Sequence, residues 1–305
     1  MVTRSPLFLH SFLRKTRLTL EMIKFEHSVF ALPFALTGAL LAWRESAFTM
    51  ERFWIRLALI IVAMVSARSV AMTFNRILDA EIDRRNPRTR MRHLPAGLLS
   101  PAFSWGFLAV AAAVFFLAAG GLNPLCLRLA PVALGIVMFY SFTKRFTSFS
   151  HLVLGLSLGI APAAAWIAIR GSLDPRILWL TAAVTFWTAG FDVIYSCQDY
   201  EFDATEGLFS LPRRFGIAGA LWIARGLHVA MILCLLALVA GFQLGALSLA
   251  GVGAIIALLI YEHSLVKSDD LSRVNAAFFT VNGYVSVLFF GFWACDIVLH
   301  RLGYL

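Results

Sequence analysis

Charged residues are scarce in this chain, and their scarcity excludes common classes of protein. Only 14% of its 305 residues are charged, against about 25% in an ordinary soluble domain. Hydrophobic residues make up 60% of the chain, whereas disordered chains are poor in them. The composition therefore excludes a disordered protein and argues against a soluble globule.

Several motifs that carry other chemistries are missing too. The four cysteines are far apart and form no Cys-x-x-Cys pair, so the sequence indicates neither a zinc site nor a disulfide framework. There is no Walker A motif for nucleotide hydrolysis by a P-loop, and no alternation of apolar and polar residues typical of a membrane β-barrel. No Pro-, Gly- or Ser-rich linker divides the chain, so residues 21–305 are predicted to form one integral domain.

The sequence does contain a series of long apolar runs. Runs of about 17–25 residues, the length of a membrane-spanning helix, recur along the whole chain. Their approximate positions are 21–44, 54–78, 102–120, 125–142, 150–170, 177–197, 217–241, 244–263 and 275–299. The sequence therefore predicts an all-α membrane protein with about nine transmembrane helices.

The basic residues predict how these spans are oriented. The net charge is +9, and 17 of the 26 Lys and Arg residues lie at the N-terminus or in loops after even-numbered spans, against 7 on the other side. This asymmetry places the N-terminus and the even loops in the cytoplasm, with the C-terminus outside. Residues 1–20 lack a signal-peptide cleavage site and are predicted to be a cytoplasmic lead-in. Basic charge in loops fits membrane topology and an anionic substrate better than nucleic acid.

Two acidic motifs lie at the ends of the second and sixth predicted spans. Their polar residues recur at an offset of 120 positions: Asn75 and Tyr195, Asp79 and Asp199, and Asp83 and Asp203. A fixed offset between two motifs on the same side of the membrane is typical of an internal duplication. We therefore predict two halves at about 21–142 and 150–263, with an additional helix at 275–299.

The spacing within each motif has a physical meaning. Residues four apart on an α-helix drift by only about 40°, so each motif predicts a polar ladder on one helix face. If the two faces meet, four carboxylates converge and repel one another unless cations lie between them. Mg²⁺ is the natural candidate, because it prefers oxygen ligands and binds through carboxylates and substrate phosphates. Solvated helix ends are the alternative for any single Asp, but the matched spacing favours a site.

Basic residues flank these acidic ladders. They lie in the loops after the second, fourth and sixth spans: Arg84, Arg85, Arg88, Arg90, Arg92, Lys144, Arg145, Arg213 and Arg214. Some of them set the topology, but acidic ladders beside basic loops suit a diphosphate with bridging Mg²⁺.

Arg68 is unusual because it lies inside a predicted span. An intramembrane Arg usually faces the bundle interior and is paired or functional. It precedes Asn75 by seven residues, on nearly the same face and about 10 Å deeper. We expect Arg68 to bind an anionic or phenolic group of a substrate or to support Asn75; a structural interhelical hydrogen bond is the alternative.

With these motifs the chain resembles the UbiA-type intramembrane prenyltransferases. Residues 75–90, NRILDAEIDRRNPRTR, are similar to the family's first Asp-rich signature, and residues 191–203, FDVIYSCQDYEFD, to its second. Arg68 and the segment from Tyr140 to Arg145, similar to the family's Y-x-x-x-K-R, agree as well. The stretches KFEHSVFALPF and YEHSLVKSDDLSRVNAAFFTVNGY are most similar to the 4-hydroxybenzoate polyprenyltransferase-like branch, some of whose members serve menaquinone synthesis. One departure is His93, where the family often has Pro.

The resemblance implies a fold and a reaction. The fold would be nine transmembrane helices around a central cavity, with the two Asp-rich helix ends under a cytoplasmic cap, in the bacterial inner membrane. The reaction would be Mg²⁺-dependent transfer of a polyprenyl chain from polyprenyl diphosphate to an aromatic acid acceptor such as 4-hydroxybenzoate, in ubiquinone or menaquinone biosynthesis.

The resemblance also implies roles for individual residues. The expected Mg²⁺ ligands are Asn75, Asp79, Asp83, Asp199 and Asp203. The expected substrate-binding residues are Arg68, Arg92, Lys144, Arg213 and Tyr140. Tyr195 is expected to hydrogen-bond the diphosphate or a metal-ligating Asp, and Asp192 to take the phenol or ring proton.

Two other classes remain as alternatives. An ion- or proton-coupled transporter also combines paired halves with polar intramembrane residues, but it should place its charges near the bilayer midplane. A non-catalytic scaffold has no need to keep carboxylates together. Neither the acceptor nor the length of the prenyl chain follows from these residues.

Overall fold

The computed structural model describes residues 17–23, 30–46 and 49–304. Residues 17–22 are helical. The helices that follow are α2 Leu32–Arg44, α3 Met50–Arg85, α4 Pro101–Leu122, α5 Pro124–Thr143, α6 Ser150–Arg170, α7 Leu178–Ser196, α8 Tyr200–Glu206, α9 Leu211–Phe242, α10 Ala246–Leu265 and α11 Asn282–Leu302. Short 3₁₀ or π-helical turns are η2 Pro175–Ile177, η3 Cys197–Asp199 and η4 Ala276–Val281. The predicted all-α class is confirmed.

Among the described residues, eight helical segments are long and apolar enough to cross a membrane. They correspond to the second through ninth predicted spans. In the first predicted span, α2 contributes 13 helical residues, and residues 24–29 lie outside the described part, as do residues 1–16 of the predicted lead-in. The protein is an integral multi-pass membrane protein.

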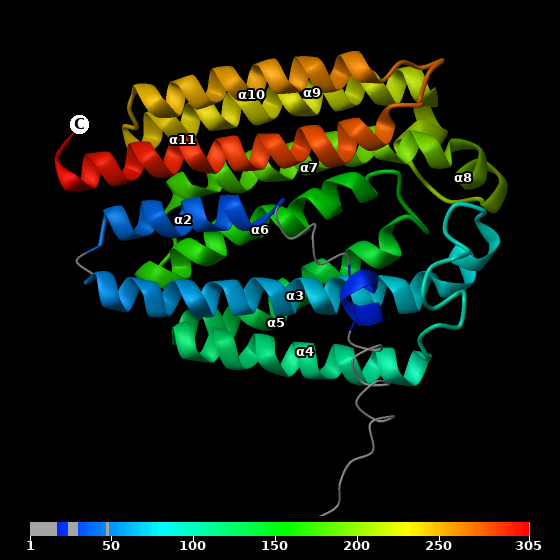
Figure 1. Cartoon of the computed structure of the whole chain (residues 1–305), viewed down its shortest axis with the longest axis horizontal. Helices are drawn as coiled ribbons and strands as arrows, with labels where there is room; N and C mark the ends of the chain where they lie inside the picture. The colour runs from blue at the N-terminus through cyan, green and yellow to red at the C-terminus, as the bar shows by residue number, and fades with distance from the viewer. Residues whose placement is uncertain (1–16, 24–29, 47–48, 305) are drawn as a thin grey trace, which may run out of the picture.

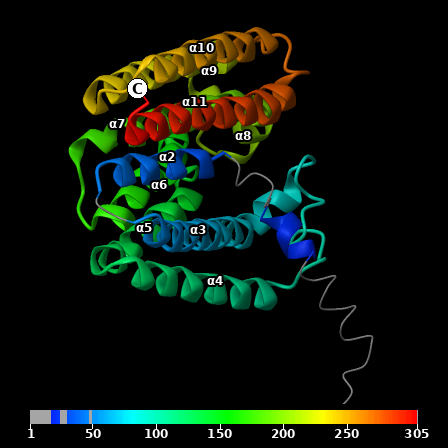
Figure 2. The same ribbon diagram turned by 60° about the vertical axis from the view of Figure 1, so that its left-hand side comes forward.

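The helices form a bundle with its core between two outer groups (Figures 1 and 2). Helix α3 packs on α4 and α5 on one side, α10 packs on α9 and α11 on the other, and α2, α6 and α7 lie between them. The largest fully buried aromatic side chains come from these inner helices and α11: Phe34, Trp166, Trp187, Phe289 and Trp293.

Helix starts follow from local sequence signals. Ser100, Asn123 and Ser210 each accept a hydrogen bond from a backbone N–H in the first turn of α4, α5 and α9. A proline follows each cap within two residues, which suits a helix start because its missing N–H is not needed there.

Helix α7, which carries the start of the second acidic motif, is held close to α6. A Cβ atom at Gly155 would lie 2.2 Å from the carbonyl oxygen of Thr185, and one at Gly159 would lie 2.7 Å from that of Thr181. Only glycine allows this approach of the two backbones, so α6 fixes the position of α7.

The two acidic motifs differ in local structure. Helix α3 continues to Arg85, so Asn75, Asp79 and Asp83 lie on one continuous helix, as predicted. The prediction of a second continuous ladder is wrong, because Tyr195 lies in α7, Asp199 in η3 and Asp203 in α8.

Side chains at the end of α7 account for this break. The Ser196 hydroxyl donates to the Val193 carbonyl at 2.8 Å, and the Cys197 thiol donates to the same oxygen at 3.4 Å. The Gln198 amide donates to the Tyr195 carbonyl at 3.2 Å. Such local side-chain bonds compete with the helical ladder of the backbone, and a 3₁₀ turn follows.

Candidate active site

Asp79, in the first acidic motif, is buried and surrounded by donors. It is 2% exposed and accepts a hydrogen bond from Lys144 Nζ at 2.5 Å. The Asn75 amide, one turn earlier on α3, donates to the same oxygen at 3.1 Å. Arg145 donates to the other carboxylate oxygen at 3.4 Å and to the Leu78 carbonyl at 2.9 Å. The segment after α5 therefore lies against the end of α3.

Asp83, one turn later, is held by the loop that follows α3. It is 5% exposed, and Arg92 donates to both of its oxygens at 2.7 and 2.8 Å. The Arg76 guanidinium lies 3.9 Å away. Thr89 donates to the Asp83 carbonyl at 3.1 Å, which turns the loop back over its own helix.

Asp199, in the second motif, is bound by the same loop. Arg88 Nε donates to Asp199 Oδ1 at 2.9 Å, and Arg88 Nη2 donates to Oδ2. The Asn86 amide donates to Oδ1 at 3.3 Å, and Arg88 also donates to the Tyr195 hydroxyl at 3.3 Å. Burial is the largest single effect on the pKa of Arg88 and lowers it, but the hydrogen bonds to Asp199 and the attraction of nearby negative groups together raise the pKa above its usual value. The two motifs thus meet through the 86–92 segment, which lies beside α8 at one end of the bundle (Figure 1).

Asp192 is held by a histidine that the sequence did not single out. His151, on α6, is 4% exposed, and its Nδ1 lies 2.7 Å from Asp192 Oδ2. Its Nε2 accepts a hydrogen bond from the Leu211 backbone N–H at 3.5 Å. An imidazole that accepts at Nε2 carries its proton on Nδ1, so His151 donates to Asp192.

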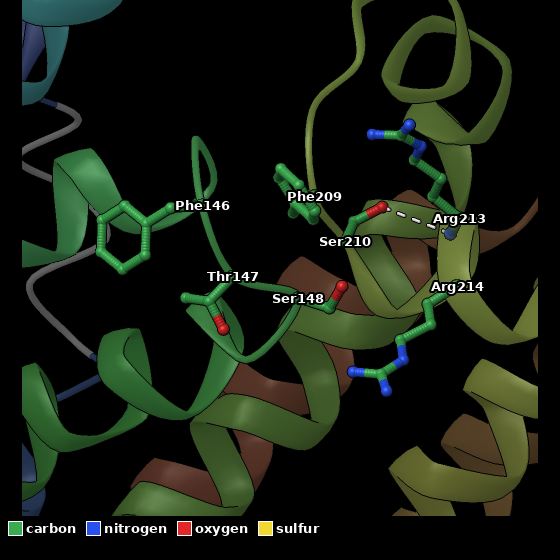
Figure 3. Close-up of a pocket in the computed structure, with 7 residues that line it drawn as sticks. All are labelled: Phe146, Thr147, Ser148, Phe209, Ser210, Arg213 and Arg214. Atoms are coloured by element: carbon green, nitrogen blue, oxygen red, sulfur yellow. Dashed lines mark hydrogen bonds between the residues drawn. The ribbon is translucent and has the colours of Figure 1, made fainter.

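The other predicted residues occupy more varied positions. Arg68 is half-buried on α3, two turns before Asn75, and Tyr140 lies in the last turn of α5, one turn before Lys144. Asp203 lies half-buried on α8. Arg213, at the start of α9, donates to the Leu208 carbonyl at 2.6 Å and lines a cavity of about 400 Å³ (Figure 3).

In this site Asp79, Asp83 and Asp199 each form an ion pair with a basic side chain from a loop. Within the described residues, no group of three or more His, Cys, Asp or Glu side chains is close enough to hold a metal ion. The donor set of the two motifs nevertheless fits a hard cation, because it consists of carboxylate and amide oxygens.

Sequence reasoning missed specific roles for Arg88, Asn86 and His151. Arg88 was one of several loop cations, and nothing local distinguished it from Arg90. His151 lies 41 residues from Asp192, so no local spacing pairs them.

Comparison with known proteins decides the family. The model of the UbiA prenyltransferase family matches residues 31–290. The chain belongs to the UbiA prenyltransferase family. Its similarity to a 4-hydroxybenzoate octaprenyltransferase of Vibrio atlanticus is 32% identity over 78% of this chain and 84% of that protein. A mitochondrial 4-hydroxybenzoate polyprenyltransferase of Homo sapiens is 34% identical over 66% of this chain and 51% of the human protein.

Solved structures of UbiA homologues share the fold. The apo structure of a UbiA homolog from Aeropyrum pernix K1 has a TM-score of 0.80 and 34% identity, covering 89% of this chain and 98% of that one. A homolog from Archaeoglobus fulgidus bound to DMAPP and Mg²⁺ has a TM-score of 0.71 at 19% identity, over 92% and 99% of the two chains. As a UbiA family member with these relatives, the protein is an enzyme of the aromatic polyprenyltransferase class.

Proposed function

We propose that this protein transfers a polyprenyl group from a polyprenyl diphosphate to the ring of a 4-hydroxybenzoate-type acceptor, as a step of quinone biosynthesis. The observation that carries the proposal is the pairing of each acidic motif with a basic loop. Lys144 holds Asp79, Arg92 holds Asp83 and Arg88 holds Asp199. These carboxylates and cations together supply the two kinds of ligand that a metal-bound diphosphate requires.

The residues proposed to hold Mg²⁺ are Asn75, Asp79, Asp83, Asp199 and Asp203. When bound, Mg²⁺ would neutralise the carboxylates and stabilise the negative charge that develops on a leaving diphosphate. The burial of Asp79 and Asp83 supports this role, because buried carboxylates need compensating positive charge.

The loop cations are proposed to exchange partners when the diphosphate binds. Lys144, Arg88 and Arg92 now neutralise carboxylates, and the diphosphate would take them as donors to its outer oxygens. Arg guanidinium groups bind such oxygens in a bidentate manner. The Tyr195 hydroxyl accepts a hydrogen bond from the Arg88 guanidinium, which also binds Asp199. Tyr195 would therefore orient this guanidinium toward the diphosphate. Arg213 is the predicted diphosphate ligand with the weakest support, because its guanidinium binds the Leu208 carbonyl.

The acceptor is proposed to bind deeper, between Arg68 and Asp192. Arg68 lies about 10 Å below Asn75 along α3, where it would bind the acidic or phenolic group. Tyr140, before Lys144 on α5, would contact the substrate between the two. The proton lost from the attacked ring carbon or its phenol would pass to Asp192. His151 donates to one oxygen of Asp192 at 2.7 Å and would leave the other free for this transfer.

Water must be kept from the allylic cation that forms as the C–O bond breaks. A dry, apolar site between the spans serves this purpose, and the apolar tail of the donor would lie against the helices. The excess of Lys and Arg in the loops on the side of the acidic motifs supports a site that opens to the cytoplasmic face of the inner membrane.

The transporter alternative has less support. A transporter is expected to place its charged site near the bilayer midplane, whereas Asp79 and Asp83 lie in the last two turns of α3. Uptake of an ion by proteoliposomes, without any prenylated product, would favour the transporter.

The test is a transfer assay with the purified full chain. Radiolabelled polyprenyl diphosphate, Mg²⁺ and a panel of aromatic acceptors would be incubated with protein in nanodiscs, and lipid products extracted. Product with 4-hydroxybenzoate is the expected result. Product only with a naphthoate-type acceptor would keep the chemistry and assign the enzyme to menaquinone synthesis. Absence of product with every acceptor, in protein shown to be folded, would overturn the proposal.

A further inference from the structure

A second basic site lies beside the acidic motifs but contains none of their residues. A cavity of about 400 Å³ opens between the segment after α5 and the start of α9, lined by Phe146, Thr147, Ser148, Phe209, Ser210, Arg213 and Arg214 (Figure 3). This volume is within the range of about 300–1,000 Å³ typical of ligand pockets.

The cavity lies at the level where several spans end. Helix α5 ends at Thr143, α6 begins at Ser150 and α9 begins at Leu211, and all three belong to segments that are long and apolar enough to cross a membrane. Four phenylalanine rings are exposed around it: Phe146, Phe149, Phe209 and Phe215. Exposed phenylalanine rings are apolar surface, which suits contact with lipid acyl chains.

The polar groups of the cavity suit an anion. Arg213 and Arg214 leave α9 in opposite directions, and Arg214 runs back below Ser148 (Figure 3). The Arg214 guanidinium lies between two rings, 6.0 Å from the centre of Phe149 and 5.2 Å from that of Phe215. Among the described residues, neither arginine has an Asp or Glu within ion-pair distance. Glu206, shortly before them in the chain, is paired with Arg85 at 2.8 Å.

Two serine residues complete the lining of the site. Ser148 is 7% exposed as a residue and lines the cavity together with Arg214 (Figure 3). A serine hydroxyl that lines a cavity can donate a hydrogen bond to an anionic ligand. Ser210, across the cavity, is 4% exposed and accepts from the Arg213 backbone N–H at 3.3 Å.

We propose that this cavity binds the headgroup phosphate of an anionic phospholipid. The phosphate would accept from Arg214 and Ser148, and the acyl chains would lie along the exposed phenylalanine rings. A lipid is favoured over a soluble anion because the polar groups are rimmed by apolar rings at the level of the span ends. The Phe209 N–H donates to the Lys144 carbonyl at 2.8 Å, so the occupied cavity would stabilise the segment that presents Lys144 to Asp79.

The experiment measures binding without turnover, so its result is independent of the proposed function. Fluorescent phosphatidylglycerol would be titrated against the detergent-solubilised full chain and then displaced with unlabelled phosphatidylglycerol, phosphatidylcholine, inorganic phosphate or pyrophosphate. Arg214→Gln should weaken phosphatidylglycerol binding by about fivefold. Ser148→Ala, which removes only the hydroxyl, should weaken it by a few-fold. Arg273→Gln is the matched control, because Arg273 is an exposed Arg on the same predicted side of the membrane and outside the cavity.

Each outcome decides the proposal. Loss with Arg214→Gln but not with Arg273→Gln, and displacement by phosphatidylglycerol but not by phosphatidylcholine, phosphate or pyrophosphate, would support it. Equal loss in both Arg variants would show a diffuse surface attraction and overturn it. Displacement by pyrophosphate as effectively as by phosphatidylglycerol would assign the cavity to a substrate diphosphate, which also overturns it.

Discussion

Arg88 donates two hydrogen bonds to the carboxylate of Asp199, and through them the loop after α3 reaches the second acidic motif. The two residues are 111 positions apart in the chain. Arg92, from the same loop, holds Asp83 of the first motif. One short loop thus links both halves of the candidate site, which explains how motifs on separate helices can act on one diphosphate.

We predict that Arg88→Gln weakens the use of the prenyl diphosphate. The substitution removes a bidentate charge-assisted contact worth about 1.5–3 kcal/mol, so kcat/KM should fall by about 10–100-fold. The measurement is steady-state transfer at varied polyprenyl diphosphate concentration. Arg90→Gln is the control because Arg90 is an exposed Arg in the same loop. Equal kinetics in the two variants would remove Arg88 from the site.

Asp79→Ala and Asp199→Ala should each abolish transfer while the protein still folds and inserts. Each change removes a carboxylate from one motif, and loss of a group that stabilises transition-state charge costs about 10²–10³-fold. Product formation and thermal unfolding of both variants would be compared with Asp270→Asn, which alters an exposed loop carboxylate. Near-normal turnover in both alanine variants would contradict the proposed site.

Removal of divalent metal should stop transfer and lower thermal stability together. A ligand that binds only the folded state stabilises it by about 2.7 kcal/mol at a hundredfold excess over Kd, so Mg²⁺ should raise the Tm of chelator-treated protein. The rise should disappear in Asp79→Asn, which keeps the size of the side chain but removes its charge. A Tm that responds equally in both proteins would place the metal elsewhere.

The parts of the fold that follow from local pattern could be predicted from the sequence. The length of an apolar run determines whether a helix can span the bilayer, and the spans from 54–78 onward match helices for this reason. The predicted start of the seventh span at residue 217 coincides with a kink at Gly216, whose φ of 71° suits glycine. The continuous ladder on α3 follows from its four-residue spacing in the same way.

Contacts between distant segments could not be predicted. The path of the loop after α3 depends on turns such as the one that Thr89 closes onto Asp83, so the choice of Arg88 as partner of Asp199 is invisible in the sequence. The break after Tyr195 depends on side-chain bonds from Ser196, Cys197 and Gln198. Their polar character was visible, but its effect on the helix was not.

Arg301, at the end of the bundle opposite the acidic motifs, should contribute to stability and not to catalysis. Arg301 donates to the Arg44 carbonyl at 2.9 Å, to the Ser46 carbonyl at 3.1 Å and also to the Trp43 carbonyl. These carbonyls end α2, where the helix dipole favours a cation. Arg301→Met should therefore lower stability by about 1–3 kcal/mol, seen as a lower Tm, with the KM for both substrates unchanged. A changed KM with an unchanged Tm would contradict this assignment.

His151 should affect the chemical step through Asp192. His151→Leu removes the hydrogen bond that orients the Asp192 carboxylate, so kcat should fall by about tenfold or more while the KM for prenyl diphosphate stays constant. His151→Gln provides the decisive comparison. The Gln amide can donate to Asp192 and its oxygen can accept from the Leu211 N–H, so Gln should restore much of kcat. A purely structural role for His151 would instead lower the Tm of the Leu variant and leave kcat of the folded fraction unchanged. Equal kcat in the Gln and Leu variants would show that the hydrogen bond to Asp192 does not assist the reaction.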